Sequence, residues 1–85
     1  MARFELRVRP FVAKDLKSLP KQSILRILEL IEGLREDPRP IGSEKLSGLE
    51  RYRIRQGRYR ILYSIFDAEV VVEIVTVGHR KDVYR

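Results

Sequence analysis

RYRIRQGRYRILYSIF, residues 51–66, is the stretch of sequence that decides the fold. Apolar and basic side chains alternate before Gly57, and alternation resumes after it. A period of two is typical of half-buried β-strands. Gln56-Gly57 is predicted to form a two-residue hairpin turn, because glycine readily adopts the positive φ that such turns need. The stretch therefore predicts two antiparallel strands, with apolar side chains on one face and arginines on the other.

Two further strands are predicted outside this hairpin. Residues 70–77 follow a tight turn at residues 66–69 and are apolar at nearly every position, which is typical of an interior strand. Residues 3–9 alternate between apolar and charged side chains, and Pro10 ends this half-buried strand. We therefore expect three antiparallel strands in the second half of the chain and a first strand that joins their edge.

Two helices are predicted between the first strand and the hairpin. Residues 11–19 have helical apolar spacing, and Pro20 ends this helix and can begin the next one. The second helix carries the clearest pattern in the chain, with apolar residues at Ile24, Ile27, Leu28, Ile31 and Leu34. DPRPIGS, residues 37–43, is predicted to be a loop. The order β-α-α-β-β-β predicts an α+β fold, an antiparallel sheet with an N-terminal helix hairpin packed on one face.

Length and composition exclude several classes of protein. The chain has 85 residues, which predicts a single domain over residues 1–85. It has no cysteine and one histidine, which argues against disulfides and against a metal centre built on Cys or His. No apolar run approaches the roughly 20 residues that span a bilayer, and the N-terminus lacks the apolar core of a secretory signal. We expect a cytoplasmic protein without cofactors that does not bind membranes.

The charge balance indicates a polyanionic partner. Lys and Arg number 18 against 12 Asp and Glu, which gives a net charge of +6 and a pI near 10.1. Such a domain is typical of nucleic-acid binders when the charge is clustered, although acidic proteins and anionic lipids also bind basic surfaces. Arginine predominates over lysine, and its planar fork can hold a phosphate in a bidentate manner.

The positive charge is concentrated in the predicted hairpin. Residues 45–60 contain six basic residues and one acidic residue, Glu50. The predicted turn places four arginines side by side on one sheet face: Arg53, Arg55, Arg58 and Arg60. Like charges that crowd one face destabilise the sheet, and a bound anion relieves their repulsion. The alternative is a solvated face with cross-strand ion pairs, for which Glu73 is a possible partner. We favour a polyanion site because the excess is so local.

The C-terminal run GHRKDVYR, residues 78–85, is predicted to extend this face. It leaves the interior strand beside the arginines, so Arg80 can reach them. Tyr84 can stack on an unpaired base, bind a phosphate or transfer a proton. His79 is the one side chain whose ordinary pKa suits acid–base chemistry near pH 7. The alternative is a frayed tail whose Tyr84 packs on the edge of the core.

Other catalytic motifs are absent from the sequence. It contains neither a GxxxxGK[ST] loop nor a GxGxxG motif after a strand. No Ser-His-Asp triad can be assembled, and no set of paired carboxylates is suited to a two-metal nuclease. We therefore expect any phosphoryl chemistry to proceed without metal.

Two segments together resemble a known family. KLSGLERYRIRQGRYRILY (residues 45–63) and VTVGHRKDVY (residues 75–84) look like the RelE branch of the RelE/ParE toxin superfamily. The matching pieces are Lys45-Leu46-x-Gly48, Arg53-Ile54-Arg55, Gly57-x-Tyr59-Arg60, Gly78-x-Arg80 and Val83-Tyr84. The predicted order of strands and helices matches that family too, so the resemblance spans nearly the whole chain.

The resemblance implies a type II toxin that acts as an mRNA interferase, a ribosome-dependent endoribonuclease that cuts mRNA in the A site and inhibits translation. It implies a RelB-like acidic antitoxin, with DNA contacted only through that antitoxin. The family's catalytic positions fall on Arg53, Arg55, Arg60, Arg80 and Tyr84. We expect six further residues to contact RNA or the ribosome: Lys45, Arg51, Arg58, His79, Lys81 and Arg85.

One departure from the family leaves alternatives open. Relatives often carry lysines where this chain has Arg53 and Arg55. Lysine can lose a proton and act as a base, whereas arginine effectively cannot. The alternative functions are a ParE-like inhibitor of DNA gyrase that is not a nuclease, and an inactive homologue that serves only as a subunit of a complex.

Overall fold

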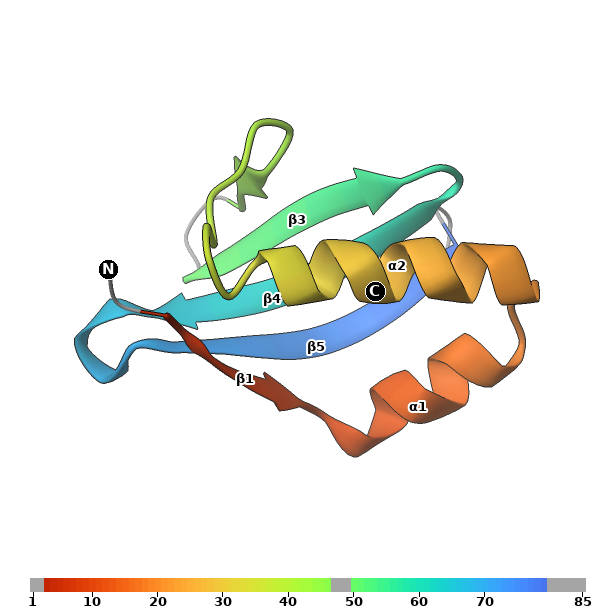
Figure 1. Ribbon diagram of the computed structural model, residues 1–85, viewed down its shortest axis with the longest axis horizontal. Coiled ribbons are helices and arrows are strands. Elements are labelled where there is room, and N and C mark those ends of the chain that lie inside the picture. Colours follow the sequence, from red (N-terminus) through yellow and green to blue (C-terminus); the bar gives the residue numbers. More distant parts are fainter. Residues whose placement is uncertain (1–2, 47–49, 80–85) are drawn as a thin grey trace.

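A computed structural model describes residues 3–46 and 50–79 of this chain. Within them the elements follow in the order β1 (Glu5–Val8), α1 (Pro10–Lys17), α2 (Lys21–Gly33), β2 (Glu44–Lys45), β3 (Arg51–Gln56), β4 (Tyr59–Phe66), the 3₁₀ helix η1 (Asp67–Glu69) and β5 (Val71–His79) (Figure 1). The predicted α+β class and order of elements are confirmed. The structure adds the two-residue strand β2, which follows the predicted loop and is too short to show a periodic pattern.

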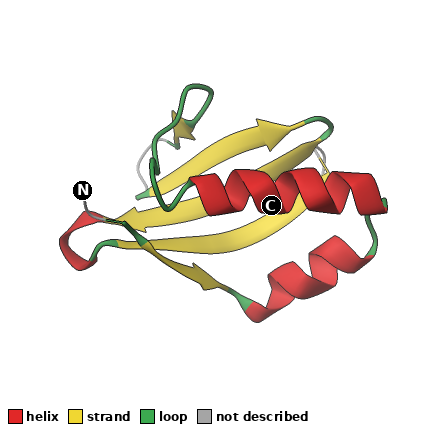
Figure 2. Cartoon of the chain, in the orientation of Figure 1, coloured by secondary structure: helices red, strands yellow, loops and turns green. Residues whose placement is uncertain are grey.

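The described strands form one sheet in the order β1-β5-β4-β3-β2. β1 runs parallel to β5, and the other neighbouring pairs are antiparallel. β5 therefore lies inside the sheet, as its apolar sequence predicts. Figure 2 shows α2 lying across one face of the sheet. α1 packs beside the C-terminal end of β5, past the point where β1 stops pairing with it. Within residues 3–46 and 50–79, no helix lies on the opposite face.

The core lies between the helices and the sheet. α1 contributes Val12 and α2 contributes Ile27 and Ile31, and all three are buried. The sheet contributes the alternate residues of β3 and β4, such as Ile54 and Ile61, which pair directly across the two strands. Because side chains alternate between the faces of a strand, this burial fixes the arginines of β3 on the helix-free face.

The β3–β4 turn lies one residue later than predicted. Gln56 pairs with Tyr59, so the turn residues are Gly57 and Arg58, and Gly57 has a φ of 61°. The predicted turn at Gln56-Gly57 is wrong because a type II′ turn places glycine at its first central position. In this register Ile54 pairs with Ile61 across the hairpin, whereas the predicted register would place Ile54 opposite Tyr59.

The β4–β5 connection also differs from prediction. The predicted tight turn is the 3₁₀ helix η1, and it is followed by Val70, whose φ is 56°. Left-handed backbone is rare for a β-branched residue. β5 therefore begins at Val71 rather than at Val70.

Arg39 ties the loop after α2 to this end of the sheet. Its Nη1 and Nη2 donate to the two carboxylate oxygens of Asp67 at 3.1 and 2.7 Å, and its Nε donates to the Tyr52 hydroxyl at 3.0 Å. The Tyr63 hydroxyl donates to the Pro38 carbonyl at 2.8 Å. Burial raises the pKa of Tyr63 to about 12. The loop is thus held by hydrogen bonds to two strands and to η1.

Asp67→Asn is expected to flatten the acid side of the stability profile. Hydrogen bonds from Arg39 hold the pKa of Asp67 below its ordinary value of 3.8. A lowered folded-state pKa stabilises the protein fully above the unfolded pKa, and this contribution disappears as the pH falls through the lower folded value. Thermal unfolding of wild type and variant across the acid range, below about pH 5, measures the difference.

The matched control for this prediction is Glu69→Gln, which removes an exposed carboxylate from the same 3₁₀ helix. It should leave the slope of melting temperature against pH close to that of wild type. Equal slopes for Asp67→Asn and wild type would contradict the prediction.

Candidate functional site

Arginines gather on the helix-free face of the β3–β4 hairpin. Arg55 pairs directly with Arg60, Arg53 pairs with Leu62, and Arg51 pairs with Ser64. Residues directly opposite each other in an antiparallel pair share one face of the sheet. We call the set Arg51, Arg53, Arg55 and Arg60 the arginine face. It contains three of the four residues that the sequence predicts to lie together.

Arg58 does not belong to the arginine face. It is exposed in the turn, at the tip of the hairpin between the two faces of the sheet. The prediction that it lies beside Arg53 and Arg55 is wrong, because the turn lies one residue later than expected. Lys45, another predicted RNA contact, is exposed on β2 and forms an ion pair with Glu50 at 3.7 Å.

Arg60 and Arg55 form the centre of the arginine face. Arg60 is only 5% exposed, whereas Arg55 directly across from it is exposed. Like charges at directly opposed positions repel each other, and a buried charge is screened less by water and salt than an exposed one. An anion bound between the two strands would relieve that repulsion. Guanidinium groups suit a phosphate here, because each presents a planar fork of N–H donors.

The counter-charge on this face comes from β2. Glu44 accepts a hydrogen bond from Arg53 at 2.6 Å, and the Arg53 side chain is largely buried. Glu73, the partner considered from the sequence, instead pairs with Arg9 at 3.2 Å. Among the carboxylates that the structure describes, none forms an ion pair with Arg55. Arg55 thus keeps positive charge that the described carboxylates do not neutralise.

The end of β5 lies next to Arg60. Gly78 pairs with Arg60 and therefore lies on the arginine face, whereas His79 pairs with Tyr59 and lies on the helix side. The rings of His79 and Tyr59 meet edge to face, with centroids 6.1 Å apart. The sequence places His79 beside the arginines, and the structure places it on the other side of the sheet. Four further predicted site residues lie outside the described residues: Arg80, Lys81, Tyr84 and Arg85.

Asp15 of α1 holds the end of β5 in place. Its Oδ2 accepts hydrogen bonds from the Thr76 hydroxyl at 3.1 Å and from the Val77 backbone N–H at 3.2 Å. β1 pairs with β5 only as far as Ile74, so the backbone N–H of Val77 has no β1 residue opposite it. Asp15 supplies the acceptor that this N–H needs. The sequence shows only a polar residue within an amphipathic helix, and no local pattern signals this contact.

Two further types of site are absent from the described residues. No group of three His, Cys, Asp or Glu residues there is placed to hold a metal ion. None of the described helices has the length and apolar character needed to cross a membrane.

Comparison with known proteins identifies the family. The sequence model of "ParE toxin of type II toxin-antitoxin system, parDE" matches residues 6–84. The chain belongs to the RelE/ParE toxin superfamily. It is 30% identical to the putative toxin RelE1 of Methanocaldococcus jannaschii, over 98% of this chain and 97% of that protein. It is 33% identical to toxin RelG of Mycobacterium tuberculosis, over 96% of this chain and 97% of that one.

Solved structures place this superfamily member near the RelE toxins. RelE in the RelE–RelB complex of Pyrococcus horikoshii superposes with a TM-score of 0.84 at 31% identity, covering 95% of this chain and 99% of that one. A mutant of Escherichia coli RelE in the free state gives a TM-score of 0.78 at 27% identity, covering 98% and 88%. The resemblance inferred from residues 45–63 and 75–84 is therefore confirmed, and the fold is RelE-like.

Proposed function

We propose that this toxin is a ribosome-dependent endoribonuclease that cleaves mRNA in the A site and so inhibits translation. The observation that carries the proposal is the directly opposed pair of Arg55 and Arg60, on a sheet face that none of the described helices covers. Such a pair can hold a phosphate from two sides. Relatives named RelE and RelG, at 30–33% identity over almost the whole chain, support the same class of toxin.

The proposed reaction uses the RNA's own nucleophile. The 2′-hydroxyl oxygen attacks the adjacent phosphorus, an O2′–P bond forms, and the P–O5′ bond breaks. The 2′-hydroxyl loses its proton and the departing 5′-oxygen gains one, which leaves a cyclic phosphate and a 5′-hydroxyl. Negative charge builds on the phosphate oxygens, and we assign its stabilisation to the guanidinium donors of Arg55, Arg60 and Arg80.

The remaining proposed roles concern orientation. Arg53, held by Glu44, fixes the RNA backbone, and Tyr84 stacks on the base and assists proton transfer. Arginine does not act as a general base, so alignment of the 2′-hydroxyl with the phosphate must supply much of the rate. Alignment of this kind can contribute on the order of 7 kcal/mol or more. The ribosome would impose that alignment on the mRNA.

We also propose a RelB-like acidic antitoxin as the partner that neutralises the toxin in the cytoplasm. Several structures with a similar fold are complexes of RelE with RelB, from Pyrococcus horikoshii and Escherichia coli among others. The net charge of +6 suits an acidic partner, and the arginine face offers it the exposed side chain of Arg55. Contact with DNA would then occur only through the antitoxin.

The test is cleavage of mRNA on programmed ribosomes, followed by primer extension. Wild type should cut within the A-site codon, and Arg80→Ala and Tyr84→Phe should each cut at least about 100-fold more slowly, because each removes a group that acts on the transition state. Wild-type rates in both variants would sink the assignment of these two residues. Absence of any cut by wild-type toxin would refute the endonuclease itself.

A second candidate function is inhibition of DNA gyrase. The description of the matching family model favours it, because that description names ParE. A supercoiling assay with purified gyrase separates the two functions: a nuclease leaves supercoiling unchanged and cuts ribosome-bound mRNA. A third possibility, an inactive subunit of a complex, predicts neither effect and no growth arrest when the chain is expressed without its antitoxin.

A further inference from the structure

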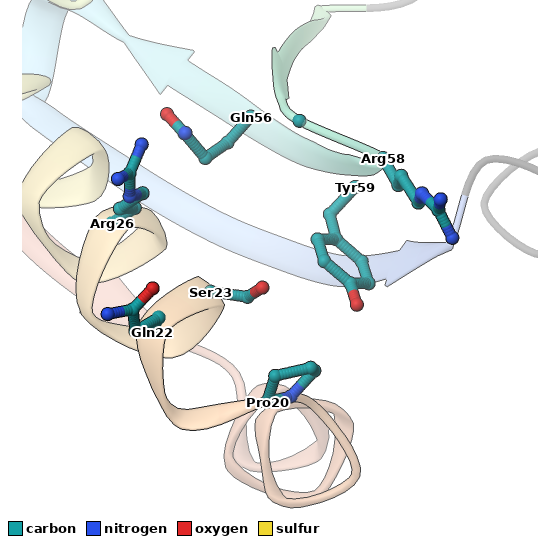
Figure 3. Close-up of a pocket in the computed structure, with 8 residues that line it drawn as sticks. Pro20, Gln22, Ser23, Arg26, Gln56, Arg58 and Tyr59 are labelled. Carbon is teal, nitrogen blue, oxygen red and sulfur yellow. The ribbon is translucent and has the colours of Figure 1, made fainter.

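A hollow of about 410 Å³ lies between the start of α2 and the β3–β4 turn (Figure 3). Its volume lies within the range of about 300–1,000 Å³ that is usual for small-molecule sites. The residues that line it include Pro20, Ser23 and Arg26 from the α2 side, and Gln56, Arg58 and Tyr59 from the hairpin. None of these lining residues is acidic, and the roles proposed above leave the hollow without a function.

The hollow has two cations. In Figure 3 Arg26 and Arg58 lie at opposite ends of it, one on the helix and one on the turn. Both are exposed, and neither side chain forms an ion pair or hydrogen bond in the part of the chain that the structure describes. By contrast, Arg3, Arg7 and Arg39 each pair with a carboxylate. The two free guanidiniums therefore favour an anion with charge at two points.

The backbone adds to this positive potential. α2 begins at Lys21, and the residue before it, Pro20, makes no side-chain capping hydrogen bond. The first N–H groups of a helix carry partial positive charge and attract anions. α2 has 13 residues, so this end is a full helix terminus.

An aromatic ring lies between the two cations. Tyr59 is half-buried, and in Figure 3 its ring projects into the hollow between Arg58 and Ser23. The ring's contact with His79 is edge to face. Aromatic faces of this kind bind nucleic-acid bases by stacking. The amide of Gln56 and the hydroxyl of Ser23 supply donors and acceptors for the edge of a base.

The hollow is also continuous with the arginine face. Tyr59 and Arg60 are neighbours on β4 and point to opposite faces of the sheet, and Arg58 lies at the rim between those faces. A strand of RNA held between Arg55 and Arg60 would therefore reach the hollow by passing over the turn. An acidic peptide would match the charge but would make less use of the tyrosine and the amides.

We propose that this hollow binds one nucleotide of single-stranded RNA, with its base on Tyr59 and its two flanking phosphates on Arg26 and Arg58. The inference rests on the proposed function, because it assigns to the hollow the mRNA that continues from the scissile phosphate. It adds a binding site on the helix side of the sheet to the catalytic residues on the other side.

The test measures binding of a fluorescent 2′-O-methyl hexanucleotide, which cannot be cleaved, to the full chain without ribosomes. Arg26→Gln and Arg58→Gln should each weaken binding about fivefold. Each should also lower the slope of log K against log salt by about 0.7, the value for one phosphate contact to a single strand. Tyr59→Leu should weaken binding about tenfold, whereas Tyr59→Phe keeps the ring and should bind like wild type.

The matched control is Arg7→Gln, which removes one exposed arginine from β1. If Arg26→Gln and Arg58→Gln bind with the same Kd and salt slope as this control, the proposal is overturned. Equal affinity for a free nucleoside monophosphate and the hexanucleotide would overturn the assignment to an RNA strand. If Arg26→Gln and Arg58→Gln lose binding to a hepta-glutamate peptide but keep their RNA binding, the hollow is a protein site instead.

This binding assay is independent of the cleavage assay. Binding that depends on Arg26, combined with intact mRNA on the ribosome, would support the hollow and refute the endonuclease. Cleavage by wild type, combined with binding that does not change in Arg26→Gln or Arg58→Gln, would support the endonuclease and refute the hollow.

Discussion

Arg60→Gln is expected to slow ribosome-dependent mRNA cleavage by about 100- to 1,000-fold, the usual cost of removing one donor that stabilises transition-state charge. Arg60 is 5% exposed and directly opposite Arg55, so its guanidinium is held in a setting where water screens it weakly. The loss should appear in kcat more than in KM, because the interaction strengthens as charge builds on the phosphate. Single-turnover cleavage on programmed ribosomes measures it.

Three controls accompany this prediction. Arg60→Lys keeps the charge but loses the planar fork, so it should recover only part of the rate. Arg7→Gln removes an exposed arginine from β1 and should cleave like wild type. Melting temperatures show whether each variant is folded, since Arg60 is buried. A folded Arg60→Gln toxin that cleaves at the wild-type rate would remove Arg60 from the proposed site.

Ile27→Ala is expected to have the largest effect on stability. Ile27 is fully buried on α2 against the sheet, and truncation of such a residue to alanine usually costs about 2–5 kcal/mol. For a domain of this size each kcal/mol lowers the melting temperature by roughly 4–8 °C. The variant should therefore melt at least about 8 °C below wild type. Thermal unfolding followed by circular dichroism measures the shift.

Leu28→Ala is the matched control, because it removes the same number of carbons from the next residue of the same helix. Leu28 is 45% exposed, so its truncation should change the melting temperature far less. Equal shifts for the two variants would mean that the loss comes from helix propensity rather than from the core.

The parts of the fold that follow from local periodicity could be predicted. The alternation through residues 51–66 gives β3, β4 and their two faces, and the apolar spacing in the second helix gives its buried side. The same alternation brings Arg53, Arg55 and Arg60 together, because parity survives a small error in the turn. The centre of the candidate site is therefore readable from the sequence.

The parts that depend on contacts between distant residues could not be predicted. The alternation alone predicts Arg58 on the arginine face, because it does not show which position of the turn glycine occupies. The sequence does not predict Glu44 as the partner of Arg53, because β2 has only two residues and shows no alternation. Asp15 accepts a hydrogen bond from a backbone N–H that is 62 residues away in the chain, and no pattern in the sequence near Asp15 indicates this contact.

The parallel pairing of β1 with β5 has a consequence for how this protein folds. Glu5 pairs with Val71, so this contact must close a loop of 66 residues, whereas the β3–β4 hairpin closes over a two-residue turn. Loop-closure entropy for such a length amounts to about 4 kcal/mol, so non-local pairing of this kind is slow. Until β1 docks, the backbone of β5 from Val71 to Ile74 forms an open edge, which an extended segment of another copy could pair with. The time that β1 needs to reach β5 therefore sets how long the newly made chain is exposed to strand exchange and aggregation.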